Sequence, residues 1–334
     1  MIPTNRQWLI AGRPNGRPLA DEDFKLAETP AREPAEGEAL VRVLWLAFDP
    51  AQKGWMENIG GYVAPTEIGE VMRGSGLGEV VASKAPELKV GDKVTGMLRW
   101  QDYATLPAKE LLKVESNDLL TAHLGVLGTT GMTAFFGLNK IGKPFAGDTM
   151  VVTGAAGATG SVVGQIGKIA GCRVIGVAGG EAKCRWLTEE LGFDEAIDYK
   201  AGGVRARLKE LAPDGIDVLW DNVGGAVFND LLGHIALHAR VVVCGGISRY
   251  ELGQMPAGPQ NYFNLIFKRA HMEGFIVSDW QSEFAWARDR LTRWIREGRL
   301  RYKEDVQTGL ENAPRTLMRL FQGQNFGKQL LKVA

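Results

Sequence analysis

The chain has 334 residues, 45% of them hydrophobic and 23% charged, and this length and composition predict a globular protein with two domains. Lysine and arginine together number 39, as do aspartate and glutamate, so bulk charge indicates neither nucleic acid nor an anionic membrane as a partner. No apolar run approaches the roughly 18 residues of a membrane span, and the first residues lack the pattern of a secretory signal. We therefore expect a cytoplasmic protein.

The N-terminal third is rich in strand and turn signals. Apolar runs at residues 38–47, 76–82 and 92–98 are bounded or interrupted by glycine and proline, as in strands joined by turns. Short strands of this kind predict a compact, antiparallel β domain.

Beyond residue 125 the pattern changes to alternating strands and helices. A helix is expected at residues 161–170, and short apolar runs typical of strands buried in a parallel sheet are at 149–153, 172–177, 195–198, 217–220, 240–244 and 273–277. This alternation predicts a doubly wound α/β domain. Further helices are expected at 284–297 and 313–321, and a final strand at 328–333.

Cysteine and histidine are scarce. Three cysteines with no close spacing suit a reducing compartment better than a disulfide framework. His234 and His238 are four residues apart on a predicted helix, a spacing that could place both on one metal ion. No cysteine and no Glu-x-x-His pattern completes such a site, so we predict no metal.

A glycine-rich turn stands between a predicted strand and a predicted helix, with the sequence Gly154-Ala-Ala156-Gly157-Ala158-Thr159-Gly160. Small residues let the backbone approach a pyrophosphate, and the following helix offers free N–H groups and the positive end of its dipole. A second strand follows the helix, which is the context that a dinucleotide-binding turn requires. We therefore interpret the turn as a cofactor site rather than as a purely structural turn.

The end of the second strand indicates which dinucleotide binds. NAD sites usually carry an acidic residue there, about 20 residues after the turn, to hold the ribose hydroxyls. This chain instead continues with Gly179 and Gly180, followed by Glu181, Lys183 and Arg185. A 2′-phosphate would fit between the glycine amides and Lys183, with Glu181 as the one competing ribose ligand. The sequence therefore favours NADPH over NADH.

Together these motifs resemble those of the medium-chain dehydrogenase/reductase superfamily, and within it the zinc-free group of leukotriene B4 12-hydroxydehydrogenases (prostaglandin reductases), plant alkenal double-bond reductases and bacterial curcumin reductases. The resemblance covers essentially the whole chain. Besides the glycine turn, it is carried by Gly128-Thr-Thr-Gly-Met-Thr133-Ala134, Ala178-Gly179-Gly-Glu-Ala-Lys183-Cys184, Leu191-Gly-Phe-Asp194, Ile197-Asp-Tyr199-Lys200, Asp221-Asn222-Val-Gly-Gly225, Val243-Cys244-Gly245-Gly-Ile247-Ser248, Gln260-Asn-Tyr262 and Gln324-Asn325-Phe-Gly-Lys328.

The resemblance implies a GroES-like β-barrel substrate domain of residues 1–124, completed by residues 299–334, and a Rossmann-type NADPH-binding domain of residues 125–298. It also implies a homodimer, and a reaction in which a hydride reaches the β-carbon of an α,β-unsaturated ketone or aldehyde. Negative charge then develops on the carbonyl oxygen, where a hydrogen-bond donor lowers the barrier. Two alternatives stay open: an NADPH-dependent quinone oxidoreductase, and an NADPH-binding protein without catalysis.

The resemblance also assigns roles to individual residues. Lys183 and Tyr199 correspond to the 2′-phosphate site, Asn222 to a place near the ribose and phosphates, and Asn325 to a residue that reaches the nicotinamide from the tail. The expected cofactor-binding set is Thr133, Gly154, Ala156, Gly157, Ala158, Thr159, Gly160, Gly179, Lys183, Tyr199, Asn222, Cys244, Gly245, Ile247 and Asn325.

Tyr262 matches the family tyrosine proposed near the substrate carbonyl oxygen, so it is the expected catalytic residue and a substrate contact. A phenol with a pKa of about 10 stays protonated at neutral pH and can donate a hydrogen bond.

The chain departs from its relatives at residues 49–56. Ala51 stands where relatives often have tyrosine, and Lys53 and Trp55 stand where they have arginine. Trp55 and Tyr62 are the remaining expected substrate contacts. The departure leaves the physiological substrate open, while it does not touch the cofactor motifs.

Overall fold

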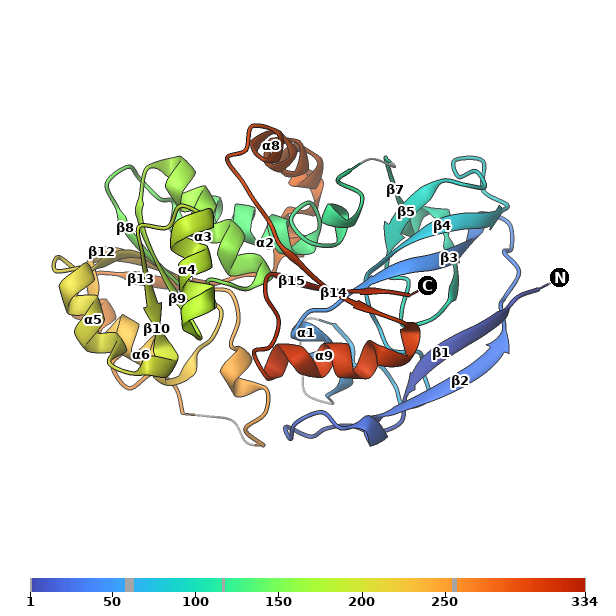
Figure 1. Ribbon diagram of the computed structural model, residues 1–334, viewed down its shortest axis with the longest axis horizontal. Helices are drawn as coiled ribbons and strands as arrows, with labels where there is room; N and C mark the ends of the chain where they lie inside the picture. Colours follow the sequence, from blue (N-terminus) through green and yellow to red (C-terminus); the bar gives the residue numbers. More distant parts are fainter. Residues whose placement is uncertain (1, 58–62, 116–117, 254–256, 334) are drawn as a thin grey trace. The chain divides into compact units, whose positions relative to one another are not determined.

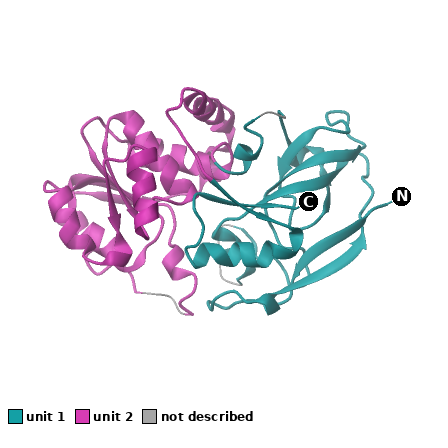
Figure 2. Ribbon diagram, in the orientation of Figure 1, with its two compact units in different colours: residues 1–125, 304–334 teal, residues 126–303 magenta. Residues whose placement is uncertain are grey.

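The computed structural model describes residues 2–57, 63–115, 118–253 and 257–333, and the chain divides into two compact units (Figure 2). Unit 1 comprises residues 1–125 and 304–334, and unit 2 comprises residues 126–303. Unit 2 is therefore an insertion between two segments of unit 1.

Unit 1 is a β domain whose described strands form two sheets (Figure 1). The larger sheet has the order β14-β15-β3-β4-β5-β7, and β6 also pairs with β3. Its strand pairs are antiparallel, except for the parallel pair β14 and β15. A separate antiparallel pair is formed by β1 and β2. The strands are β1 (Thr4–Ile10), β2 (Phe24–Pro30), β3 (Glu38–Ala47), β4 (Gly76–Ser83), β5 (Lys93–Gly96), β6 (Tyr103–Pro107), β7 (Leu112–Val114), β14 (Glu304–Thr308) and β15 (Lys328–Lys332).

One hydrophobic core joins the two segments of unit 1. Val41 and Leu46 of β3 are buried in the same cluster as Leu317 of α9 (Ala313–Phe321) and Leu331 of β15. Burying each such side chain contributes about 1.5–3 kcal/mol relative to exposure, so packing holds residues 304–334 to the N-terminal strands. The β architecture of unit 1 fits the GroES-like fold that the sequence resemblance implies, and the predicted domain bounds stay predictions.

Unit 2 contains a parallel sheet, and its described strands follow the order β10-β9-β8-β11-β12-β13. With β8 taken as the first strand, this order is 3-2-1-4-5-6, which is the order of a Rossmann fold. The topological switch point, where ligands of such sheets bind, then lies between β8 and β11. The strands are β8 (Thr149–Thr153), β9 (Arg173–Ala178), β10 (Glu195–Asp198), β11 (Ile216–Asp221), β12 (Ile235–Val243) and β13 (His271–Gly274).

Helices cover both faces of this sheet. Leu208 of α5 and Leu231 of α6 share a core with Val151 of β8, while Gly167 of α3 lies against Met150. Because Met150 and Val151 are neighbours on one strand, they point to opposite faces. The helices of unit 2 are α2 (Thr129–Phe136), α3 (Ala158–Ala170), α4 (Glu181–Arg185), α5 (Val204–Leu211), α6 (Gly225–Leu232), α7 (Asn264–Phe267) and α8 (Phe284–Arg296).

The strand expected at residues 273–277 is displaced. The structure has β13 at His271–Gly274, an edge strand that pairs with β12 and exposes all four residues. The apolar run at residues 275–277 moved the predicted strand toward the C terminus. The true strand is not apolar, because an edge strand does not need to be buried on both faces. The expected strands at 149–153 and 195–198 are confirmed as β8 and β10.

The helix expected to carry His234 and His238 is absent. The helix α6 ends at Leu232, His238 lies within β12, and the Nε2 atom of His234 lies 2.7 Å from the carbonyl oxygen of Ala212. The two histidines therefore do not lie one turn apart on a shared helix face.

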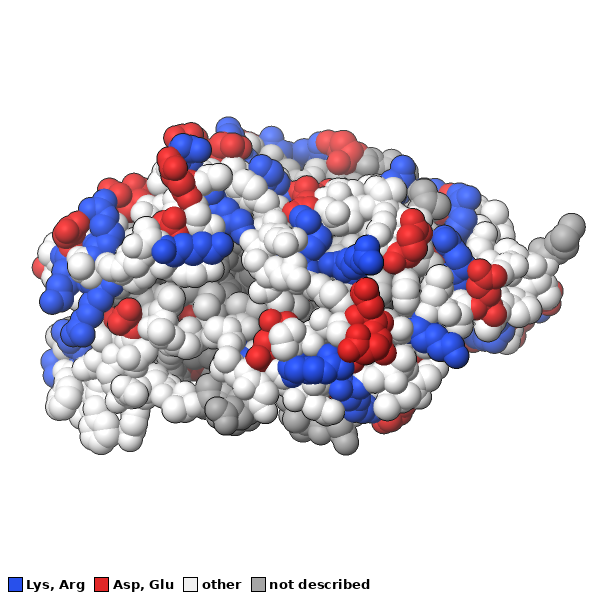
Figure 3. Space-filling model, turned by 60° about the horizontal axis from the view of Figure 1, so that its bottom comes forward, with Lys and Arg blue, Asp and Glu red and all other residues white. Residues whose placement is uncertain are grey.

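Among the residues described above, no helix is both long enough and apolar enough to cross a bilayer. Figure 3 shows one face of the protein, on which acidic and basic side chains are interspersed.

Candidate functional site

The glycine turn joins β8 to α3 at the carboxyl edge of the unit 2 sheet. Gly154 has φ +58°, a left-handed value that glycine adopts without strain. A Cβ atom at Gly160 would overlap the carbonyl oxygen of Gly154 and lie 2.8 Å from the Cα of Ala155. No side chain caps the N terminus of α3 at Gly157. The turn is thus a backbone cradle with open helix amides, which suits a pyrophosphate.

A hydrogen-bond network joins the ends of β8 and β11. The Thr153 hydroxyl donates to the buried Asp221 carboxylate at 2.7 Å and accepts the N–H of Asn222 at 2.8 Å. The Asn222 Nδ2 donates to the carbonyl oxygen of Thr153 at 2.7 Å, and its Oδ1 accepts from Trp220 at 3.1 Å. The protein therefore fixes the Asn222 side chain and leaves one of its amide hydrogens for a ligand.

The Asp221 carboxylate holds the loop after β11 in shape. It accepts the N–H groups of Val223 at 3.2 Å and Gly224 at 2.9 Å, and its own carbonyl oxygen accepts those of Cys244 and Gly245. Burial raises the pKa of Asp221, and the hydrogen bonds from Thr153 and the loop amides oppose that rise. Asp221 therefore holds the segment of residues 222–225 next to the segment of residues 244–247.

The segment of residues 244–247 adjoins the Asn222 loop. The Ile247 N–H donates to the carbonyl oxygen of Asn222 at 3.2 Å. Burial, with a smaller contribution from the charge of Asp221, raises the pKa of Cys244 to about 12. The thiol is therefore protonated at neutral pH and is not a nucleophile.

The end of β9 carries the residues expected at the 2′-phosphate. Gly179 lies under the Tyr199 ring, because a Cβ atom at Gly179 would be 2.9 Å from the Tyr199 Cε1. Lys183 lies half-buried in α4, which follows Gly180 directly. Glu181, the competing ribose ligand, forms an ion pair with Arg185 at 2.7 Å. Glu181, the acidic residue that follows the end of β9 most closely in sequence, is therefore already paired with a cation.

Three other expected site residues lie outside these loops. Thr133 is in α2, and its hydroxyl donates to the carbonyl oxygen of Thr129 at 2.8 Å. Tyr262 is 52% exposed, and its ring centroid is 4.9 Å from that of Phe263. Asn325 belongs to unit 1, where its Nδ2 donates to the carbonyl oxygen of Gly327 at 3.1 Å. Their roles stay predictions.

The residues expected at the substrate are in unit 1. Trp55 lies in α1 (Ala51–Met56), and Tyr62 lies outside the described residues. In the same helix Lys53 is fully buried and pairs with Glu57 at 3.0 Å, and Glu57 also accepts the N–H of Asn15 at 2.8 Å. Breaking such a buried pair typically costs about 3–5 kcal/mol, so α1 is firmly anchored.

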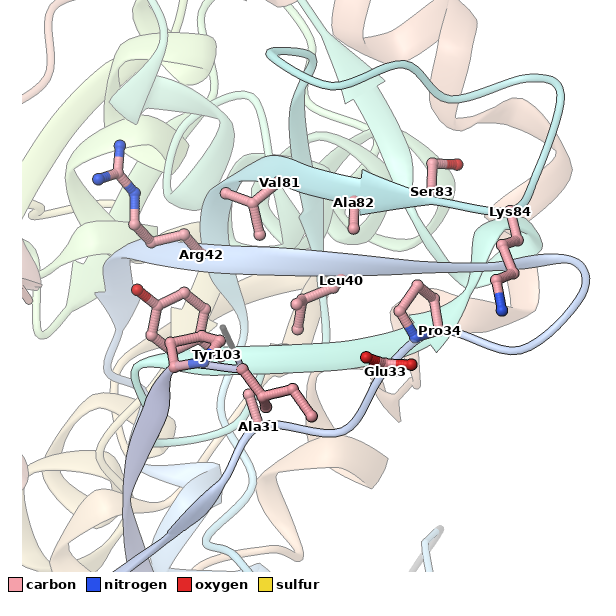
Figure 4. Close-up of a pocket in the computed structure, with 12 residues that line it drawn as sticks. Ala31, Glu33, Pro34, Leu40, Arg42, Val81, Ala82, Ser83, Lys84 and Tyr103 are labelled. Atoms are coloured by element: carbon pink, nitrogen blue, oxygen red, sulfur yellow. The ribbon is translucent and has the colours of Figure 1, made fainter.

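A hollow of about 550 Å³ lies elsewhere in unit 1 (Figure 4). Leu40 of β3 and Ala82 of β4 form its floor, and Glu33, Arg42 and Tyr103 contribute polar groups at its rim. None of the expected site residues that the structure describes lines it, so we assign it no role in the proposed reaction.

No group of three or more His, Cys, Asp or Glu side chains that could hold a metal ion is found in the described residues.

Three further residues shape the site although the sequence predicted no role for them, namely Thr153, Asp198 and Asp221. Asp198 ends β10, and its carboxylate accepts the N–H of Gly180 at 2.9 Å, so this amide is already engaged and is not open to a phosphate. That hydrogen bond is the main reason why the pKa of Asp198 is lowered. An aspartate at a strand end before a turn is the available signal, since such side chains bond local backbone amides.

Comparisons with known proteins match this arrangement over the full chain. Residues 6–114 match a family model described as the N-terminal domain of oxidoreductase, and residues 158–293 match one described as zinc-binding dehydrogenase. The NADPH-dependent curcumin reductase of Escherichia coli K12 is 40% identical, covering 99% of this chain and 97% of the relative. The NADP(+)-dependent 2-alkenal reductase of Nicotiana tabacum is 37% identical, covering 99% and 98%.

A solved structure, that of CurA from Vibrio vulnificus in complex with NADPH, is 40% identical and superposes with a TM-score of 0.94 over 98% of this chain and 99% of the other. Identity at this level over whole chains establishes common membership of a family. The chain belongs to the medium-chain dehydrogenase/reductase superfamily, in the group that contains the curcumin, 2-alkenal and prostaglandin reductases.

Proposed function

We propose that this protein is an NADPH-dependent oxidoreductase that reduces the carbon–carbon double bond of α,β-unsaturated ketones and aldehydes. The observation that carries the choice of NADPH is the end of β9, where Gly179 and Gly180 stand in place of the acidic ribose ligand and Glu181 is paired with Arg185. The proposed reaction is supported by two relatives that are 40% and 37% identical to this chain, a curcumin reductase and a 2-alkenal reductase. In this proposal unit 2 binds the cofactor.

The residues present fit NADPH. The turn from Gly154 to Gly160 suits the pyrophosphate because no side chain caps the first amides of α3. Gly160 permits this tight turn, since a side chain there would collide with the Gly154 carbonyl oxygen. Asn222 and the backbone of residues 244–247 would hold the ribose and nicotinamide side, and Lys183 and Tyr199 the 2′-phosphate. NADPH supplies the hydride when it is bound.

The task of the protein side chains is then to stabilise charge on the substrate. Reduction at the β-carbon moves negative charge to the carbonyl oxygen, so a donor aimed at that oxygen lowers the barrier more than it stabilises the bound ground state. Tyr262 is our candidate for this donor, since it matches the family tyrosine and its phenol is exposed. The proposed chemistry requires no metal ion.

A panel of acceptors tests the proposed reaction. We expect NADPH oxidation with an enone or a 2-alkenal to exceed that with naphthoquinone or duroquinone, and to survive dialysis against a chelator. Faster turnover of quinones would favour the quinone oxidoreductase, and no turnover with any acceptor would favour a binding protein. Stoichiometric zinc lost together with activity would contradict the metal-free chemistry.

Replacing Lys183 with alanine tests the choice of cofactor. A charged hydrogen bond to a phosphate contributes about 1.5–3 kcal/mol, so Lys183→Ala is expected to raise the KM for NADPH about 10- to 150-fold. The slower reaction with NADH should be nearly unchanged. Arg185→Ala, which removes an exposed cation already paired with Glu181, is the matched control. Equal losses with both cofactors in Lys183→Ala would refute this role.

Replacing Tyr262 with phenylalanine tests the proposed donor. Loss of one such donor costs about 10²–10³ in rate elsewhere, and a ribose hydroxyl could replace part of it, so we expect a 10- to 100-fold lower kcat, with the KM for NADPH unchanged. Tyr103→Phe removes a phenol hydroxyl in unit 1 and should leave kcat unaltered. Full activity in folded Tyr262→Phe would show that the tyrosine is structural.

We further propose that the protein is a homodimer. Within the described residues β13 is an edge strand that pairs with β12 on one side, and the preceding helix α7 leaves Ile266 65% and Phe267 66% exposed. An apolar patch beside an open strand edge favours pairing with another chain. Light scattering should give twice the 36.4 kDa mass of one chain, and Ile266→Asp should yield monomer while Val90→Asp, at an equally exposed position of unit 1, should not. A monomeric wild type would contradict this proposal.

We also propose a cytoplasmic location. Cys172, Cys184 and Cys244 are free thiols in the structure, which suits a reducing compartment. Fractionation of cells that express the protein should recover it with the cytoplasmic enzymes, and recovery in the medium or with membranes would argue against this location.

A further inference from the structure

The strand ends of β9 and β10 place a second lysine beside the predicted 2′-phosphate site. The two strands run parallel in register, with Asp198 opposite Ala178, so the residues that follow them leave the sheet side by side. An ideal Cβ atom at Gly179 would lie 3.0 Å from the Cε of Lys200 and 3.0 Å from the Cζ of Tyr199. The stem of Lys200 and the ring of Tyr199 therefore both cover the backbone of Gly179.

Asp198 fixes this arrangement. One of its carboxylate oxygens accepts the N–H of Gly180 and the N–H of Lys200, each at 2.9 Å. The same oxygen thus ties the loop after β9 to the loop after β10. Because Lys200 is the second residue after Asp198, its side chain starts from a backbone position that the carboxylate holds in place.

The local charges leave this corner positive. The charge of Asp198 is stabilised mainly by backbone amides, and Glu181 is paired with Arg185. In the part of the chain that the structure describes, no acidic side chain lies within 4.0 Å of the exposed Lys200 ammonium. A phosphate dianion placed near Gly179 would therefore meet an ammonium that is not neutralised by an ion pair.

We propose that Lys200 is a specificity-determining residue that binds the 2′-phosphate of the cofactor together with Lys183. The two lysines come from different strand ends, one after β9 and one after β10, so the phosphate would join the two loops. This inference rests on the proposed use of NADPH. It adds to that function a second cation at the 2′-phosphate. NAD sites usually carry an acidic residue at this place, which would repel the phosphate.

Binding of adenosine fragments tests the proposal without any turnover. Calorimetry with 2′,5′-ADP and with 5′-AMP isolates the contribution of the 2′-phosphate. We expect Lys200→Gln to weaken 2′,5′-ADP binding about 10- to 150-fold and to change 5′-AMP binding less than twofold. Lys200→Arg should retain most of the affinity, since it keeps the charge. Lys209→Gln, which removes an exposed lysine of α5, is the matched control and should have no effect.

The outcomes separate this inference from the proposed function. If the wild type binds 2′,5′-ADP no better than 5′-AMP, the preference for NADPH is wrong. If the wild type discriminates and Lys200→Gln discriminates equally well, Lys200 is not a phosphate ligand and the inference is overturned. Equal weakening of both fragments in Lys200→Gln would also overturn it, because that result indicates a disturbed adenosine site. A Lys183→Ala/Lys200→Gln double variant should show non-additive losses, as expected when two groups bind one phosphate.

Discussion

The close approach of α3 to the sheet is the constraint on which the cofactor turn depends. Three glycines at helical spacing form the face of α3 that meets the sheet and its loops. At Gly160, Gly164 and Gly167, an added Cβ atom would overlap the Gly154 carbonyl oxygen, the Phe193 ring and the Met150 methyl group, respectively. The helix backbone can therefore lie nearer to β8 than other residues would allow. This close packing sets where the first amides of α3 stand, and with them the anion-binding geometry of the turn.

Two aspartates hold the loops around the predicted cofactor site, and backbone N–H groups donate hydrogen bonds to both carboxylates. Asp221 connects the loop after β11 to Thr153, and Asp198 connects the loops after β9 and β10. Their pKa values move in opposite directions, because burial dominates at Asp221 and amide hydrogen bonds dominate at Asp198. In both cases the carboxylate is turned toward N–H groups. A site for a polyphosphate can therefore contain carboxylates without repelling its ligand strongly.

The sequence predicted those features that depend on neighbouring residues. The strands at 149–153 and 195–198, the helix at 313–321 and the doubly wound α/β class of the second domain follow from short apolar runs, helical spacing and their alternation. The edge strand β13 was misplaced because it lacks the buried faces on which such a prediction rests. The roles of Asp198 and Asp221 could not be predicted, since their partners Gly180 and Thr153 are 18 and 68 residues away in the chain. The position of Lys200 over Gly179 likewise follows from strand register, which no local pattern gives.

At residues 49–56 the chain differs from its relatives in two ways, which the structure of α1 separates. Lys53 retains the positive charge of the arginine expected there, and its buried pair with Glu57 anchors the helix to the backbone of Asn15. A neutral residue at 53 would leave the buried Glu57 carboxylate without its cationic partner, so this position is constrained by stability. Ala51 and Trp55 carry no such charge, and at these two positions of α1 the chain differs from its relatives in the size of the side chain. Unit 2 has a hydrophobic core of its own, separate from that of unit 1. Trp55 is a proposed substrate contact, so variation there is expected to alter the choice of acceptor, and the core of unit 2 contains neither Trp55 nor Ala51.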